Sequence, residues 1–320
     1  MDLVNHLEGR LLFAIPKKGR LQQATLELLE GSDIQFKRGN RLDIALVKNH
    51  QIALVFLPAA DIPTFVGEGR VDLGITGADQ VAEHEALSPA TEETGVERVL
   101  DLGFGKCKLQ VQVPEQGEID RPERLVGMNV VTSFVGLTEQ YFARLEGLDN
   151  NMVNKVGDVP VRNRLRTRIK YVGGSVEAAC ALGVADGIVD LVESGETMKA
   201  AGLKAIDTVV ESTAVLIASK HPSNQKLVDI IRRRIEGFIA AQKYILCQYN
   251  VKRALLKEAT TITPGKRAPT ITALEDPDWA AVNSMVLKEE IASVMDRLTA
   301  CGAEDILVFN IANSRPGLGG

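Results

Sequence analysis

The sequence has few cysteines and no long apolar run. Its four cysteines, Cys107, Cys180, Cys247 and Cys301, lie far apart, and none belongs to a C-x-x-C pair. Such thiols are typical of reduced, core-packed cysteines rather than of a disulfide framework or a structural zinc site. The four histidines are equally scattered, so no metal-ligand cluster is visible. No stretch approaches the roughly 20 apolar residues that a transmembrane helix needs.

The chain also lacks a strong excess of one charge. Its 37 Lys and Arg residues face 42 Asp and Glu residues, for a formal net charge of -5. That balance argues against a nucleic-acid or membrane surface. The first 20 residues carry acidic residues ahead of a short apolar run and are not typical of a secretory signal. We therefore expect a cytoplasmic protein, and 320 residues leave room for two or three domains.

What is present is an alternation of short apolar runs with helical patterns. In the first half, strands are predicted at 11–16, 42–48, 51–57 and 71–77, and helices at 19–31, 60–69 and 78–87. Further on, strands are predicted at 105–114, 127–134, 168–174, 186–194 and 206–219, and helices at 135–147, 175–185 and 195–202. This alternation predicts parallel α/β sheets with ligands near the strand ends. We expect two lobes joined by strands crossing near 103–110 and 205–215, with lobe I at 1–104 and 205–221 and lobe II at 105–204.

The pattern changes after residue 221. Residues 222–242 have apolar side chains at helical spacing and charges opposite, which predicts a connecting helix. Residues 243–320 then follow the order βαββαβ, which is the ferredoxin-like motif. The predicted fold is therefore α/β, with a two-lobed unit like that of periplasmic binding proteins and a separate C-terminal ferredoxin-like domain.

The stretch "GIVDLVESGETM" at 187–198 places a turn between an apolar strand and a helix. Gly195 would let a ligand approach the backbone, and Ser194 and Thr197 offer hydroxyls, which together suit a phosphate. Asp190 and Glu193 would repel a bare phosphate but suit the hydroxyls of a sugar, so a ribose phosphate fits both halves. The alternative is an ordinary helix start, capped by Ser194 and with an acidic residue in its first turn.

A longer pattern runs from Glu177 to Met198, with glycines and polar residues at fixed offsets. It resembles the signature of the ATP phosphoribosyltransferase family, which opens histidine biosynthesis. "PKKGRL" at 16–21, "VDLGITGADQV" at 71–81, "DLGFGKCKL" at 101–109 and "GGSVEA" at 173–178 resemble other parts of that family, in order. The resemblance covers nearly the whole chain and is closest to the long, fungal-like form.

The resemblance implies a reaction in which adenine N1 of ATP attacks C1′ of 5-phosphoribosyl 1-pyrophosphate (PRPP), and pyrophosphate leaves. It implies Mg²⁺ as cofactor and Asp190 and Glu177 as catalytic carboxylates. Residues expected to bind PRPP are Glu193, Ser194, Gly195, Glu196 and Thr197. The resemblance also makes residues 243–320 a histidine-binding regulatory domain. Active dimers and inhibited hexamers of this chain are expected, with L-histidine as allosteric inhibitor.

Lys18 and Arg20 in "PKKGRL" are expected to bind ATP phosphates, with a solvated basic loop as the alternative. Backbone groups of Thr76, Gly77 and Ala78 are expected to face the same substrate, although an ordinary tight turn would have the same sequence. Segment 161–171 places arginines and a lysine at period two. A pyrophosphate trough and a solvated edge strand both fit that spacing, and we favour the edge strand.

The main competing interpretation is a non-catalytic, two-lobed solute- or effector-binding protein, since such proteins share the expected fold. An exported binder would need a signal peptide and a regulator a helix-turn-helix, and neither is visible. A different phosphoribosyltransferase is the second alternative. Many of those have adjacent acidic residues before the phosphate turn, whereas Asp190 and Glu193 are separated here.

Overall fold

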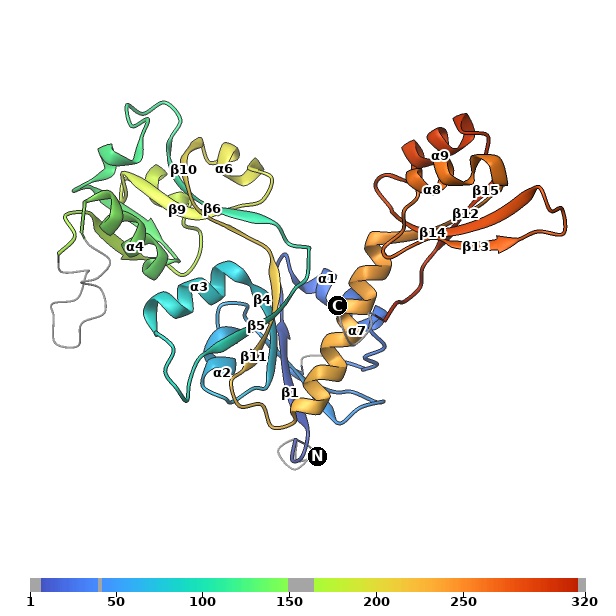
Figure 1. Ribbon diagram of the computed structural model, residues 1–320. Coiled ribbons are helices and arrows are strands. Elements are labelled where there is room, and N and C mark those ends of the chain that lie inside the picture. The colour runs from blue at the N-terminus through green and yellow to red at the C-terminus, as the bar shows by residue number, and fades with distance from the viewer. Residues whose placement is uncertain (1–6, 40–41, 149–163, 316–320) are drawn as a thin grey trace. The chain divides into compact units, whose positions relative to one another are not determined.

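The computed structural model describes residues 7–39, 42–148 and 164–315. The chain divides into two compact units, one of residues 1–26 and 35–228 and the other of residues 27–34 and 229–320. The first unit holds two lobes, each built on its own sheet (Figure 1). An α/β fold with two lobes and a C-terminal ferredoxin-like domain is therefore confirmed.

Lobe I is a six-stranded sheet in the order β2-β3-β1-β4-β11-β5. Its strands are β1 (Leu11–Pro16), β2 (Ile44–Leu46), β3 (Ile52–Leu57), β4 (Leu73–Gly77), β5 (Val96–Asp101) and β11 (Ala214–Ser219), and its helices are α1 (Gln22–Gly31), α2 (Ile62–Gly67) and α3 (Ala78–Leu87). Strands β1, β3 and β4 are parallel and almost wholly buried. Their carboxyl ends therefore share one edge, where the loop at 17–21 and the start of α3 lie.

Lobe II is a five-stranded sheet in the order β10-β6-β9-β7-β8. Its strands are β6 (Cys107–Pro114), β7 (Asn129–Thr132), β8 (Arg168–Tyr171), β9 (Gly187–Val192) and β10 (Leu203–Ser212), and its helices are η2 (Pro122–Leu125), α4 (Val135–Leu145), α5 (Ala178–Ala181) and α6 (Glu196–Ala200). Strands β7, β8 and β9 are parallel, whereas β6 and β10 run antiparallel to their neighbours. Both sheets are thus mixed: the expected parallel strands form the core of each, and antiparallel strands flank them.

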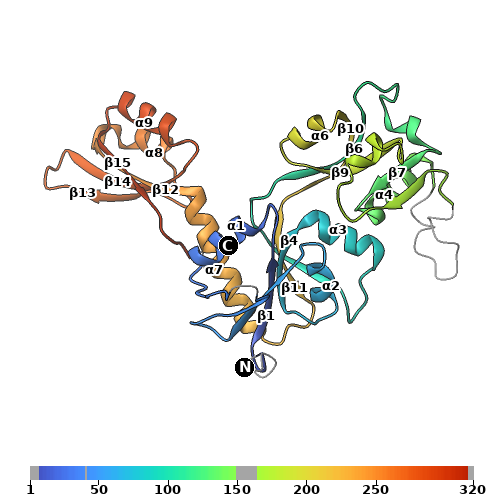
Figure 2. The same cartoon turned by 180° about the vertical axis from the view of Figure 1, so that it is seen from behind.

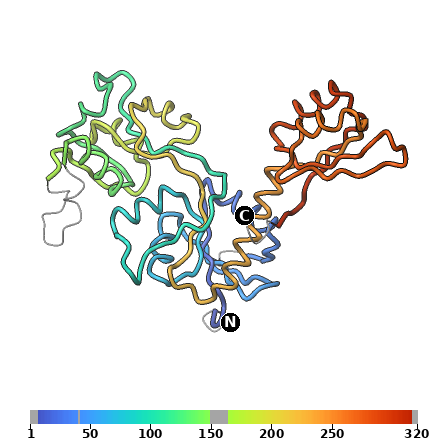
Figure 3. The backbone as a smooth tube through the Cα atoms, in the orientation of Figure 1, coloured from blue at the N-terminus to red at the C-terminus, as the bar shows by residue number. Residues whose placement is uncertain are grey.

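The expected single strand at 206–219 is two strands in two different sheets. Strand β10 pairs with β6 in lobe II up to Ser212, and β11 then pairs with β4 and β5 in lobe I from Ala214. Thr213 lies between them, and its carbonyl accepts a hydrogen bond from the Ala78 N–H at the start of α3. Lobe II therefore reaches Ser212 rather than residue 204. Figure 3 shows this crossing and the one that enters β6.

Three further local expectations differ from the structure. Strand β5 was missed because three of its six residues, Glu97, Arg98 and Asp101, are charged and exposed at the sheet edge, which hides any strand pattern. The helix expected at 175–185 is reduced to the four residues of α5. The edge strand favoured for the basic segment is present as β8 but is shorter than expected. Arg168 and Lys170 share its exposed face, Arg164 and Arg166 precede it, and residues 161–163 lie outside the described residues.

The second unit contains α7 (Gln225–Lys243) from Asp229 onward and the expected βαββαβ order. Its elements are β12 (Tyr244–Lys252), η5 (Arg253–Leu255), α8 (Leu256–Ile262), β13 (Thr270–Ala273), β14 (Trp279–Leu287), α9 (Ile291–Ala300) and β15 (Glu304–Asn310). The antiparallel order β13-β14-β12-β15 is that of the ferredoxin-like fold. The Phe238 ring of α7 packs against Gly31 at the end of α1, and Figure 2 shows these helices side by side.

All four cysteines are free, as the sequence indicated. Three of them are buried, and only Cys180 is partly exposed. Within the described ranges, no helix combines the length and apolar character that crossing a membrane requires.

The buried hydroxyl of Tyr249 generates a stability prediction for the second unit. Tyr249 is fully buried, and its hydroxyl lies 2.7 Å from that of Thr263. Tyr249→Phe removes this bond and should lower the free energy of unfolding by about 1 kcal/mol. Trp279 is the only tryptophan and lies in the same sheet, so urea unfolding followed by its fluorescence reports this unit. Exposed Tyr171→Phe is the control, and equal midpoints for wild type and Tyr249→Phe would contradict the prediction.

Candidate active site

A cavity of about 240 Å³ opens where β9 ends and the turn into α6 begins. Among the described residues, all of its walls come from lobe II. They are Gln112, Glu177, Asp190, Leu191, Val192, Glu193, Ser194, Gly195, Thr197 and Met198. The structure thus brings together both predicted catalytic carboxylates and four of the five predicted PRPP-binding residues. The exception is Glu196, which is exposed on the first turn of α6 and does not line the cavity.

The turn itself depends on a glycine. Gly195 has φ of 80°, a left-handed conformation that side chains with a Cβ rarely adopt, and it occupies the N-cap position of α6. Ser194 stands one residue earlier, and its hydroxyl accepts the Glu196 N–H over a long 3.4 Å. The simple helix-start interpretation, with Ser194 at the cap, therefore does not describe this turn. The Ser194 and Thr197 side chains line the cavity instead.

Asp190 is the carboxylate most affected by its surroundings. Burial raises its pKa to about 6, the Leu191 N–H partly opposes this, and the neighbouring charge of Glu177 raises the pKa further. Asp190 accepts the Leu191 N–H at 2.8 Å and has no cationic partner among the described residues. A desolvated carboxylate beside a second carboxylate is typical of a site that receives hydroxyl donors or a cation from a ligand.

Two residues of this cavity region were not identified from the sequence. Gln112 is buried on β6, lines the cavity, and donates to the Asp190 carbonyl at 3.3 Å. The sequence did contain a signal for Gln112, because a polar glutamine between two valines is unusual in a buried strand. Ser175 has φ of 51° two residues before Glu177, which is an unfavourable conformation for a non-glycine residue. Such strain is often retained at functional sites, but sequence alone does not reveal it.

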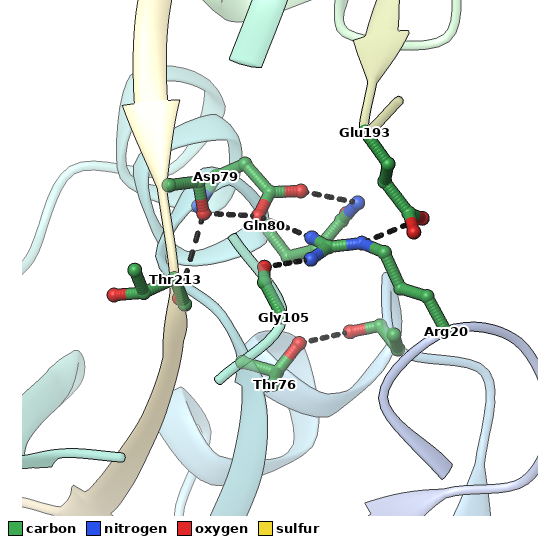
Figure 4. Close-up of polar contacts among 9 residues, drawn as sticks. Arg20, Thr76, Asp79, Gln80, Gly105, Glu193 and Thr213 are labelled. Atoms are coloured by element: carbon green, nitrogen blue, oxygen red, sulfur yellow. Dashed lines mark hydrogen bonds and ion pairs between the residues drawn. The ribbon is translucent and has the colours of Figure 1, made fainter. Parts of the chain in front are cut away.

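Arg20 lies at the junction of the two lobes (Figure 4). Its guanidinium donates to the Asp79 carboxylate at 3.1 Å and to the carbonyl of Gly105, and its Nε lies 3.8 Å from the Glu193 carboxylate of lobe II. Asp79 is fully buried and also accepts a hydrogen bond from the Ser212 hydroxyl. Gly77 makes this arrangement possible, because a Cβ there would meet both Asp79 and Arg20.

The backbone groups expected to face ATP are already hydrogen bonded within the protein. The Ala78 N–H donates to the Thr213 carbonyl, and the Asp79 N–H donates to the Ser212 hydroxyl at 2.9 Å. Thr76 is buried, and its hydroxyl donates to the Ala59 carbonyl at 2.7 Å. The Ala78 N–H is therefore used by Thr213, the residue between β10 and β11. The assignment of the Thr76, Gly77 and Ala78 backbone to ATP stays a prediction.

The remaining predicted ATP-binding side chain, Lys18, is exposed in the loop between β1 and α1. Its neighbour Lys17 is held by Asp43 at 2.8 Å, and Arg20 of the same loop is held by Asp79. A second cavity of about 420 Å³ lies beside the crossing strands. It shares Val192 and Glu193 with the first cavity. Its walls also include Ala78, Arg98, Lys106, Cys107, Lys108, Glu211, Ser212 and Thr213.

The donor set suits a magnesium ion only in part. Among the described residues, no group of three or more His, Cys, Asp or Glu side chains could hold a metal ion. Glu177, Asp190 and Glu193 nevertheless line one cavity, and hard carboxylate oxygens are the ligands that Mg²⁺ prefers. Such a set fits an ion that arrives with substrate phosphates rather than one held by the protein alone.

Comparison with known proteins gives the same picture over the whole chain. Residues 58–237 match the profile described as HisG: ATP phosphoribosyltransferase, and residues 241–313 match the profile described as HisG, C-terminal domain. The ATP phosphoribosyltransferase of Yarrowia lipolytica is 60% identical over 315 residues, which cover 98% of this chain and all of the relative. That of Schizosaccharomyces pombe is 56% identical over 318 residues, with coverage of 99% and 100%.

A solved structure supports the fold. The ATP phosphoribosyl transferase (HisG:HisZ) complex from Thermotoga maritima aligns with a TM-score of 0.56 at 22% identity, and it covers 72% of this chain and 98% of the matched chain. The solute-binding interpretation is not supported by these relatives. The chain belongs to the ATP phosphoribosyltransferase family, whose enzymes condense ATP with PRPP in the first step of histidine biosynthesis.

Proposed function

We propose that the cavity at the end of β9 binds PRPP and that ATP meets it from lobe I. One observation carries this proposal: two carboxylates and the hydroxyl-bearing turn of Gly195 gather around one cavity of about 240 Å³. The turn offers Ser194 and Thr197 to the 5-phosphate. Asp190 and Glu177 are placed to accept hydrogen bonds from the ribose hydroxyls.

The carboxylates also suit the charge that develops during the reaction. Breaking the bond between C1′ and pyrophosphate leaves positive, oxocarbenium-like charge on the ribose. Ionised Asp190 and Glu177 would stabilise that charge more strongly than they stabilise the neutral ground state, which is what accelerates a reaction. The cavity wall offers no cation to PRPP in the described residues, so neutralising the leaving group needs another source.

We infer that Mg²⁺ fills that need. Asp190, Glu177 and Glu193 are the residues that would hold it, together with substrate phosphates. When bound, the ion would neutralise charge on the departing pyrophosphate. The raised pKa of Asp190 supports this assignment, because a nearby cation would favour its ionised form.

On the ATP side, we assign Lys18 and Arg20 to the nucleotide. Arg20 reaches within 3.8 Å of Glu193, which borders both cavities, so it stands where the two substrates would meet. The larger cavity adds the cations Lys106, Lys108 and Arg98, of which Lys108 pairs with Glu211 and Arg98 with Asp101. Catalysis by this arrangement is mainly positioning of two polyanions.

We further infer that the second unit binds L-histidine and carries subunit contacts in a cytoplasmic homo-oligomer. One face of its sheet packs on α8 and α9 through a buried core that includes Tyr249. Leu246, Met285 and Phe309 are adjacent in the register and belong to the opposite face, where Phe309 and Leu307 are about half exposed. An apolar sheet face of this kind supports contact with another copy of the chain.

The PRPP-binding turn gives the first functional prediction. Thr197→Ala should weaken PRPP binding about 10-fold, because one hydroxyl partner of the phosphate is lost. Gly195→Val should weaken it further, since valine is strained at φ of 80° and its side chain blocks approach to the backbone. Titration calorimetry measures both, with Thr208→Ala in lobe II as control. Wild-type affinity in both variants would exclude this turn as the site.

Asp190 gives a pH prediction. Since its pKa is about 6, kcat/KM for PRPP should rise with pH through that value as the carboxylate ionises. Asp190→Asn should lose this acid limb and fall roughly 100-fold in kcat at pH 8. Exposed Asp120→Asn serves as control. An unchanged acid limb in Asp190→Asn would assign the titration to another group.

The same pKa fixes the sign of a stability effect. A carboxyl whose pKa is higher in the folded than in the unfolded state stabilises the fold while protonated, and this contribution is lost as pH rises through about 6. Asp190→Asn should therefore raise the Tm by a few degrees at about pH 8, and this gain should vanish below about pH 4. Calorimetric scans at both pH values check this, and a lower Tm at high pH would contradict it.

The regulatory proposal predicts that millimolar L-histidine lowers kcat without raising the KM for PRPP. Light scattering should detect a larger assembly at the same time. A chain ending at Gln242 should remain active and ignore histidine, and Phe309→Lys should block the larger assembly by placing a charge on the apolar face. A flat activity curve for the full chain would refute inhibition by histidine and leave the catalytic assignment intact.

A further inference from the structure

The two lobes touch through helices α3 and α4, away from the substrate cavities. Gly136 in the first turn of α4 allows this close approach. A Cβ at this position would lie 2.9 Å from the Ala86 Cβ and 3.1 Å from the Leu87 side chain, both in α3. Substituting a larger residue would therefore push α3 and α4 apart.

A carboxylate from lobe I caps the lobe II helix at this contact. Glu83 of α3 accepts the Gly136 N–H at 2.8 Å and the Leu137 N–H at 2.9 Å, one with each carboxylate oxygen. The residue at the N-cap position of α4, Phe134, provides no side-chain cap. The first-turn amides of α4 therefore donate to a carboxylate of the other lobe. A carboxylate is favourable at this position because the N-terminus of a helix carries partial positive charge.

This contact lies one helical turn from Asp79, which holds Arg20. Residues 79 and 83 are four apart in α3 and therefore share one face of that helix. Asp79 fixes the Arg20 guanidinium at 3.1 Å, and Glu83 fixes α4 of lobe II. One short helix thus joins the group that faces ATP to the lobe that holds the PRPP cavity.

We propose that Glu83 is a positioning residue that sets the approach of the two lobes and so aligns Arg20 with Glu193 at the border of the PRPP cavity. Its carboxylate touches no residue of either cavity, so it acts through α3 and α4. Burial raises the pKa of Glu83, and the hydrogen bonds from the amides of α4 only partly oppose this, so the ionised form of this carboxylate is disfavoured at the contact. A group retained under that penalty is consistent with a role beyond stability. The proposal goes beyond the assignment of PRPP and ATP to the cavities.

The proposal predicts that changing Glu83 affects kcat but not the binding of PRPP. The PRPP cavity is built from lobe II residues alone, so PRPP binding should not depend on Glu83. Joining the substrates does depend on the lobe approach, and small misplacement of reacting groups is costly. Glu83→Gln keeps the shape of the side chain but removes its charge. It should leave the PRPP Kd within about twofold of wild type while kcat falls roughly 10- to 100-fold.

Hydrogen–deuterium exchange of the full-length protein gives a direct reading of the contact. In Glu83→Gln, exchange should speed up in peptides covering the first turn of α4, while the β9–α6 turn keeps its wild-type exchange. Gly136→Ala should reproduce the loss of kcat and the faster exchange of α4 from the opposite side of the contact, because its Cβ meets Ala86. The double variant should lose little more than either single variant, since both changes open one contact.

Glu146→Gln is the matched control. This carboxylate is also buried, with 2% exposure, and it accepts the N–H groups of Arg166 and Thr167 within lobe II. Glu146→Gln should lower the free energy of unfolding without changing the kcat of the folded enzyme.

Three results would overturn the proposal: wild-type exchange of α4 in Glu83→Gln, faster exchange with wild-type kcat, or a PRPP Kd that weakens in parallel with kcat. A wild-type enzyme inactive on ATP and PRPP would contradict the substrate assignment instead, and the exchange data would still decide the role of the contact.

Discussion

The buried carboxylate of Asp79 is the constraint on which the arrangement of the first unit depends. An ionised carboxylate without access to water needs donors from the protein, and Asp79 obtains them from Arg20 and Ser212. These donors come from the loop after β1 and from the last residue of β10, while Asp79 itself opens α3. The hydrogen bonds of this one carboxylate therefore fix Arg20, the end of strand β10 and the first turn of α3 at a single point.

The two lobes divide the chemistry between them. Lobe II supplies carboxylates and hydroxyls around its cavity, and lobe I supplies the cation Arg20 beside Glu193. Asp190 is partly desolvated in this cavity, so its negative charge is poorly stabilised by water. The cavity therefore favours ligands that bring hydroxyl groups or positive charge to this carboxylate. Burying that carboxylate costs stability, and the catalytic role proposed above would account for this cost.

Much of the fold and of the candidate site could be predicted from the sequence. Two exceptions depend on contacts between residues that are distant in the sequence. The order of elements, the ferredoxin-like unit and the members of the β9–α6 turn follow from local patterns, because apolar periodicity and glycine positions are local properties. The crossing near 205–215 was expected and is confirmed, but its exact position at Thr213 was not, since the run 206–219 is uniformly strand-like and only the change of hydrogen-bonding partner from β6 to β4 divides it. Glu83 looks like any polar residue of an amphipathic helix until its partners, 53 and 54 positions away, are known.

The two connections between the lobes also determine how the lobes can move. The Leu102 N–H donates to the Ala214 carbonyl, and the Ala214 N–H donates to the Phe104 carbonyl, so the two linkers are bonded to each other at the crossing. Beyond that point β6 and β10 pair along their full length in lobe II. Bending is therefore confined to a few residues around Gly103, Gly105 and Thr213, the two glycines having φ of 79° and 64°. Paired linkers resist twist and shear, so any relative motion of the lobes that keeps these hydrogen bonds is a rotation about one axis, and it would bring the same side chains together each time.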